Sequence, residues 1–198
     1  MGLGFSRTLS TGGKTVFQGH GGDIQLAQGG FGLDITGLPL GALIRQGTPM
    51  NFDETTRVAK VLKTAKVVET AGGSATAYKV EKGHLFATSD VVSKTVGGAS
   101  YTITGAIDTS NADYDVINVT TTLGAAAVGD VLFHSAASGA SAGALKVEPK
   151  GLLYEEKVVS AAEGASIAIR ATVYENLAPS ANSEIKAAMP HIIYSKSY

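Results

Sequence analysis

The glycines of this chain gather near its N-terminus, and there they limit what the chain can fold into. Of the 25 glycines, eight lie between Gly12 and Gly32. Glycine loses more backbone freedom on folding than any other residue, so we do not expect this segment to fold as an independent unit. We therefore divide the chain into an extended glycine-rich N-terminal arm, residues 1–38, and a β-rich domain, residues 39–198.

Larger apolar side chains interrupt this arm at intervals. Six of them are our candidate docking residues: Phe17, Ile24, Leu26, Phe31, Leu33 and Ile35. A flexible segment with spaced apolar anchors is typical of a peptide that docks on another protein. Two other interpretations stay open: the arm is a disordered tail, or the six side chains pack on the β domain of their own subunit.

Beyond residue 38 the pattern predicts mainly β-strands. Residues 101–107 alternate with period two, residues 116–122 are almost all β-branched, and residues 129–133 follow a turn. The longest clear strand is predicted over residues 167–174, and residues 191–194 predict the last one. Regularly spaced strands with glycine-rich turns indicate an all-β fold, a sandwich or a barrel-like module.

Three further segments complete the predicted fold. Residues 40–50 predict a short apolar strand that ends in a Gly-Thr-Pro turn. Residues 58–69 fit helical spacing as well as a half-exposed strand, and we favour the strand because valine is frequent and two glycines follow. One short C-terminal helix is predicted between Asn182 or Ser183, as its N-cap, and Pro190, which stops it.

Charge and composition restrict the partners. The chain has 16 Lys and Arg against 17 Asp and Glu, so it has no large positive field and we expect no nucleic-acid partner. Only 17% of its residues are charged, which suits a subunit whose surface is covered by copies or by a partner. We find neither a signal-peptide pattern nor an apolar run long enough for a membrane-spanning helix, so we expect no membrane partner.

Motifs for catalysis or metal binding are few. Cysteine is absent, which excludes a disulfide framework and a thiolate metal site. The four histidines lie far apart in sequence, without the close pairs typical of zinc sites: His20, His84, His134 and His191. Residues 139–143 have the letters of a Gly-x-Ser-x-Gly elbow, but they lie in a Ser-Ala-Gly run without its strand–turn–helix context.

One cluster of carboxylates remains. Asp108, Asp113 and Asp115 offer oxygen ligands for calcium, yet the glycine and the closing glutamate of an EF-hand loop are missing. We therefore favour a solvated turn here. We predict that the protein is not an enzyme and has no catalytic residue, no metal and no cofactor.

Several short segments resemble those of a known group of proteins. They occur in this order: Val128-Gly129-Asp130-Val131-Leu132, Pro149-Lys150-Gly151-Leu152-Leu153, residues 167–179 and residues 185–192. Residues 39–50 also resemble the start of such domains. Over about residues 38–198, the chain is similar to the head-decoration and head-fibre proteins of tailed bacteriophages.

The resemblance implies a structural protein of the virion without catalytic activity. Such a protein is assembled in the host cytoplasm, lies on the capsid exterior as a homotrimer, binds the major capsid protein and stabilises the head, with or without a head fibre. Related proteins use a glycine-rich arm that orders on the capsid. The alternative is an adhesin or a carbohydrate-binding β-module, although such modules usually display an aromatic platform and this chain has no tryptophan.

Overall fold

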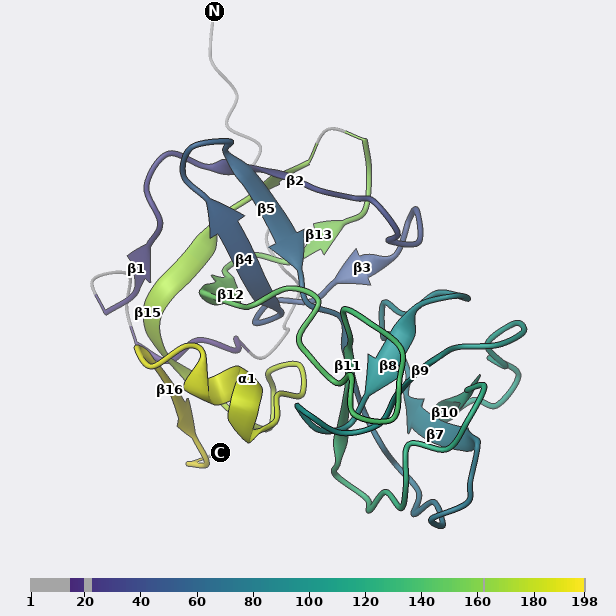
Figure 1. Ribbon diagram of the computed structural model, residues 1–198. Helices are drawn as coiled ribbons and strands as arrows, with labels where there is room; N and C mark the ends of the chain where they lie inside the picture. The colour runs from purple at the N-terminus through teal and green to yellow at the C-terminus, as the bar shows by residue number, and fades with distance from the viewer. Residues whose placement is uncertain (1–14, 20–22, 162, 198) are drawn as a thin grey trace, which may run out of the picture.

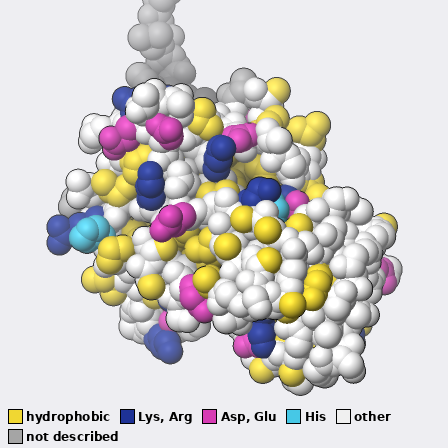
Figure 2. All heavy atoms as spheres, viewed as in Figure 1, with side chains coloured by type: hydrophobic (Ala, Val, Ile, Leu, Met, Phe, Trp, Pro, Cys, Tyr) yellow, Lys and Arg dark blue, Asp and Glu magenta, His cyan; other side chains and the backbone are white. Residues whose placement is uncertain are grey.

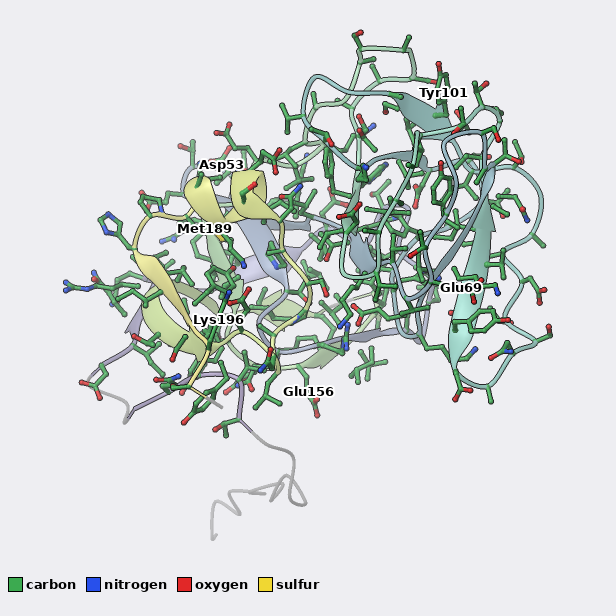
Figure 3. The ribbon with its side chains drawn as sticks, turned by 90° about the horizontal axis from the view of Figure 1, so that it is seen from below. Asp53, Glu69, Tyr101, Glu156, Met189 and Lys196 are labelled. Carbon is green, nitrogen blue, oxygen red and sulfur yellow. The ribbon has the colours of Figure 1, made fainter. Side chains whose placement is uncertain are left out.

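The computed structural model describes residues 15–19, 23–161 and 163–197, and over them the protein is all-β with one short helix, as the sequence predicts. Figure 1 shows two lobes side by side. We call residues 15–62 and 148–197 the barrel lobe, and residues 63–147 the insertion lobe. Figure 3 separates them from below: Tyr101 and Glu69 lie in the insertion lobe, Met189 and Lys196 in the barrel lobe.

The barrel lobe is a sheet whose hydrogen-bonded path returns on itself, in the order β1-β15-β12-β4-β5-β2-β14. Its strands are β1 (Gln25–Leu26), β2 (Phe31–Leu33), β4 (Pro49–Asp53), β5 (Val58–Val61), β12 (Gly151–Leu153), β14 (Gly164–Ala165) and β15 (Ile167–Tyr174). Ser166 alone separates β14 from β15, and four residues separate β1 from β2. Both ends of the path therefore continue into its inner strands, and the sheet closes into a small barrel.

Alternation along the strands divides the buried side chains of this lobe into two clusters. Leu153 and Ile167 point into the barrel core, whereas their neighbours Leu152 and Ala168 point to the outside. In the core, the rings of Phe31 and Phe52 pack with centroids 4.9 Å apart. All of β12 and the first two residues of β15, Ile167 and Ala168, are thus buried on both faces of the sheet, which explains their apolar sequence.

A helix and a last strand cover the outer cluster. The helix, α1 (Ser183–Ala187), is capped by Asn182, whose Oδ1 accepts a hydrogen bond of 2.9 Å from the Ile185 N–H. Ile185 is completely buried against the barrel. After Pro190 the chain forms β16 (Ile192–Ser195), which pairs with β15 in parallel. The cap, the stop and the last strand agree with the sequence.

The described part of the predicted arm belongs to the barrel lobe. Its pairing runs antiparallel along β14 and β15, through the partners Phe17 and Val173, Leu26 and Ala168, and Gly32 and Gly164. Gly29 and Gly30, both with positive φ, provide the turn between β1 and β2. The boundary drawn at residue 38 thus does not separate two bodies, because the long β14–β15 segment gives this glycine-rich stretch a backbone partner. Residues 1–14 and 20–22 of the arm lie outside the described residues.

The insertion lobe contains two small antiparallel sheets, one in the order β6-β11-β8-β9 and one pairing β10 with β7. Its strands are β6 (Thr64–Lys66), β7 (Ala77–Glu81), β8 (Val91–Ser93), β9 (Ser100–Thr102), β10 (Tyr114–Asn118) and β11 (Val131–His134). Its core is its own, since every buried member lies between Ala65 and Leu132. Tyr78 anchors that core: it is completely buried, and its hydroxyl donates to the Ala75 or Gly124 carbonyl and accepts from the Leu123 N–H.

Several predicted strands differ in extent. The strand expected over residues 116–122 is β10, which ends at Asn118. Residues 58–69 form two strands, β5 and β6, because Leu62 and Lys63 carry the chain from one lobe to the other. The strand expected over residues 101–107 ends at Thr102, and Gly105 turns the chain with a φ of 67°. Residues 40–50 form β3 (Leu43–Ile44) and the start of β4. Within the described residues, no helix is long and apolar enough to cross a membrane.

Candidate functional site

Exposed apolar side chains gather on a two-stranded ribbon formed by β3 and β13 (Lys157–Val158). Val158 lies opposite Leu43, and the Gly41 N–H donates a 3.0 Å hydrogen bond to the Val159 carbonyl, which places Leu40 beside the pair. The exposed fractions are 76% for Leu40, 45% for Leu43 and 51% for Val158. Single exposed apolar residues are common, whereas an adjoining group indicates an interaction surface. We call these three side chains the apolar ribbon.

The register of β3 and β13 explains why these side chains face outward. Ile44 and Val159, their neighbours in sequence, are buried in the barrel core. The pleat then turns Leu43 and Val158 to the opposite face. Among the described strands, β3 and β13 pair only with each other, so the ribbon also presents unpaired strand edges. An apolar face next to free edges suits contact with another protein.

Two of the six residues predicted to dock on a partner are buried within this chain. Phe17 and Phe31 are 6% and 3% exposed. The other four are half-buried: Ile24 and Leu26 pack against the outer cluster, and Leu33 and Ile35 against the barrel core. These six side chains therefore pack on the β domain of their own subunit, which is one of the two alternatives that the sequence left open. No residue of the apolar ribbon was among them.

The predicted aspartate cluster does not converge on one point. Asp108 Oδ1 accepts a 2.9 Å hydrogen bond from the Ser110 N–H, and hydrogen bonds to Ser110 lower the pKa of Asp108. Asp115 is instead buried and paired with Lys82 at 2.7 Å. Within the part of the chain that the structure describes, no group of three His, Asp or Glu side chains lies close enough to hold a metal ion.

A buried polar cluster joins the two lobes. Lys63, 3% exposed, donates from Nζ to Asp90 Oδ2 at 2.6 Å and to the Gly37 carbonyl at 2.5 Å. His134 Nε2 lies 3.6 Å from Asp90 Oδ1. Burial lowers the pKa of His134, while the charge of Asp90 opposes this shift. The Ala87 N–H also donates to Asp90 Oδ2. Because Lys63 binds both Asp90 and the Gly37 carbonyl, it links the insertion lobe to the barrel lobe.

His84 is a second buried histidine, 5% exposed at its side chain. Its Nδ1 accepts a hydrogen bond of 3.2 Å from the Phe86 N–H. Its Nε2 lies 3.4 Å from Asp115 Oδ2, without hydrogen-bond geometry. Burial lowers the pKa of His84, against the opposing charge of Asp115. With its carboxylate neighbour already bound to Lys82, this histidine is a packing residue of the insertion lobe.

No family model, curated protein or solved structure matches the chain. The proposed function therefore rests on the geometry of the chain. That geometry singles out the apolar ribbon as the candidate interaction surface. Sequence reasoning missed it because Leu40, Leu43 and Val158 have the same residue types as the core, and only the register of β3 with β13 separates the exposed residues from the buried ones.

Proposed function

We propose that the chain is a structural auxiliary protein that binds the outer surface of a tailed-phage head and stabilises it. The observation that carries this proposal is the apolar ribbon, with its free strand edges. The resemblance of the sequence to head-decoration and head-fibre proteins implies the partner, the major capsid protein. Copies of the same chain, arranged as a homotrimer, are the second expected contact.

The energetics suit a protein that acts in many copies. Burying the exposed part of each of three aliphatic side chains contributes on the order of 1 kcal/mol per side chain. A contact of this size is weak alone, because association itself costs several kcal/mol of lost freedom. Copies joined to each other and to one shell bind together, so that avidity raises the overall affinity without any new contact.

The surface charge fits the same role. Figure 2 shows Lys, Arg, Asp and Glu side chains of both signs scattered over one face, with hydrophobic side chains reaching the surface between them. Near the ribbon, Lys157 is paired with Glu155 at 3.8 Å. A surface without a large field of one sign allows identical copies to approach closely, since they do not repel one another strongly.

The test is attachment of the purified chain to heads of a tailed phage that carries its gene. Heads lacking the protein are mixed with it at about 10 µM, a concentration that detects contacts of roughly −7 kcal/mol. The proposal predicts saturable co-sedimentation and a higher temperature of DNA release from decorated heads. A chain that stays in the supernatant, or one that binds without changing the release temperature, would contradict it.

A further inference from the structure

A hollow of about 260 Å³ lies where the two lobes meet. Asp34, Lys60 and Val61 line it from the barrel lobe, and His134 and Lys146 line it from the insertion lobe. Figure 2 shows Lys and Arg side chains beside a histidine on the face where the lobes adjoin. Pockets that hold drug-sized molecules measure about 300–1,000 Å³, so this hollow suits a smaller ligand.

We propose that the hollow binds a small organic acid, a carboxylate carried on a short apolar body. This activity goes beyond attachment to a head and does not depend on it. Three features support the proposal: an excess of positive charge, a histidine whose ring nitrogens are free, and an apolar wall beside them.

Positive charge exceeds negative charge around the hollow. The charged groups that line it or adjoin it are Lys60, Lys63, Lys146, Asp34 and Asp90. Lys63 is paired with Asp90 at 2.6 Å, and Lys60 Nζ lies 3.9 Å from Asp34 Oδ2. The Lys146 side chain has neither an ion pair nor a hydrogen bond with any described residue. One cation is thus left over, and a ligand with a single negative charge gives it a partner, in a partly enclosed place where water screens the attraction less.

His134 offers a hydrogen-bond donor beside this cation. The Lys146 N–H donates a 2.9 Å backbone hydrogen bond to the His134 carbonyl, which holds the two residues side by side. Within the described chain the ring makes no hydrogen bond: its Nε2 lies 3.6 Å from Asp90 Oδ1, and neither ring nitrogen is closed off from solvent. A carboxylate can accept from an imidazole N–H and from an ammonium group at once.

The remaining wall of the hollow is apolar. Leu38 and Val147 are half-buried, Val61 is buried, and all three line the hollow. Inorganic phosphate has no carbon to place against such a wall, whereas the body of an organic acid buries apolar surface there. The wall therefore favours a carboxylate with a short aliphatic or aromatic body. For a ligand of this size we expect a dissociation constant of about 1 mM.

The experiment is an NMR titration of the full chain, followed by amide shifts, with benzoate and isovalerate as probes. Benzamide and isovaleramide have similar shapes without the charge, and inorganic phosphate has the charge without the apolar body. We expect the acids to shift signals of residues 34–38, 60–63 and 146–147 in a saturable way, and each amide to bind at least about tenfold more weakly. Amides that bind as tightly as the acids, tighter binding of phosphate, or the lack of a saturable shift at these residues would each overturn the proposal.

The ring of His134 reports where the carboxylate lies. Burial lowers the pKa of His134 most, Asp90 opposes this shift, and the charges of Lys63 and Lys146 lower the pKa further. A carboxylate bound beside the ring favours its charged form, so saturating benzoate raises this pKa and binding tightens as the pH falls. Ring signals followed between about pH 5 and pH 8 measure the change. An unchanged pKa would place the ligand away from the ring and contradict the proposed site.

Variants tie binding to the hollow. Lys146→Met removes the unpaired cation at an exposed position, and we expect at least about a fivefold loss of benzoate affinity. Lys60→Met leaves the Asp34 carboxylate to repel the ligand and weakens binding to a similar extent. Lys66→Met is the matched control and keeps the affinity, because Lys66 is also exposed and unpaired among the described residues but lines a different hollow. Thermal unfolding checks that each variant is folded; a folded Lys146→Met protein that binds benzoate as the wild type does would overturn the proposal.

Discussion

Lys63 Nζ lies 2.6 Å from Asp90 Oδ2, and this buried ion pair lies in the insertion lobe where that lobe meets the barrel lobe. Lys63 is the first residue of the insertion lobe, two residues after the end of β5, and it also donates to the Gly37 carbonyl of the barrel lobe. Asp90 precedes β8 (Val91–Ser93) in the insertion lobe. Two charges withdrawn from water cost several kcal/mol of desolvation, so the pair is tolerated only because each group has its partner in place.

Lys63→Met therefore leaves the Asp90 carboxylate buried without a cation, and we expect the free energy of unfolding to fall by about 3–5 kcal/mol. The double variant Lys63→Met/Asp90→Asn loses much less than the sum of the two single variants. Urea unfolding measures all four species. Lys79→Met is the control: its pair with Glu69 is exposed to solvent, so the loss of stability is much smaller. Additive losses at Lys63 and Asp90 would show that the pair is not coupled.

The two buried histidines make stability depend on pH. Burial lowers the folded-state pKa of both His84 and His134 below the ordinary value of 6.5. The unfolded chain therefore takes up protons first as the pH falls. The stabilisation is complete above pH 6.5 and is lost as the pH falls towards the folded-state values.

The measurement is the free energy of unfolding in urea at about pH 7.5 and about pH 5.5, a range in which histidine titrates. We expect a fall towards the lower pH in the wild type and a smaller fall in His84→Gln/His134→Gln. His191→Gln, at an exposed position, is the control and keeps the wild-type fall. Equal falls in all three proteins would contradict the assignment.

Gly151 shows how tightly the barrel strands approach each other. A Cβ added there would lie 2.5 Å from the Ala168 carbonyl oxygen and 2.8 Å from Ile167 Cγ2. Because the first contact is with backbone, β12 and β15 would have to move apart. We expect Gly151→Ala to lower the free energy of unfolding by about 1–3 kcal/mol.

Gly73→Ala is the matched control, since nothing lies within 4 Å of its added Cβ. Its stability should be unchanged or raised by up to about 1 kcal/mol, through a less flexible unfolded chain. Thermal and urea unfolding measure the stability of both variants relative to the wild type. A Gly151→Ala protein as stable as Gly73→Ala would mean that the strands are less closely packed than described.

The sequence predicted those elements whose signals are local. The strand over Ile167–Tyr174 has the predicted bounds, because β-branched and apolar residues fill it and a glycine turn precedes it. The helix was predicted from its cap Asn182 and its stop Pro190. The closure of the barrel was not predictable, since the parallel pairing of Gly32 with Val58 and the pairing of Leu26 with Ala168 join distant residues.

The candidate site shows the same limit of prediction from sequence. Phe17 and Phe31 looked like docking anchors because glycines surround them, yet a partner strand within the chain buries both. Leu43 lies in the apolar strand predicted over residues 40–50, and its register opposite Val158 exposes it. Residue type sets the preference for burial, and only long-range pairing decides which apolar side chains stay outside.

The most direct test of the proposed function is attachment of a ribbon variant to phage heads. Leu43→Asp/Val158→Asp changes two exposed positions, so the free energy of unfolding should stay within about 1 kcal/mol of the wild type. Val128→Asp, at a position that is 62% exposed on the insertion lobe, is the matched control. The account predicts that the wild type and Val128→Asp co-sediment with heads equally, and that the ribbon variant loses at least about tenfold in affinity, or 1.4 kcal/mol. Equal attachment of all three proteins would contradict it.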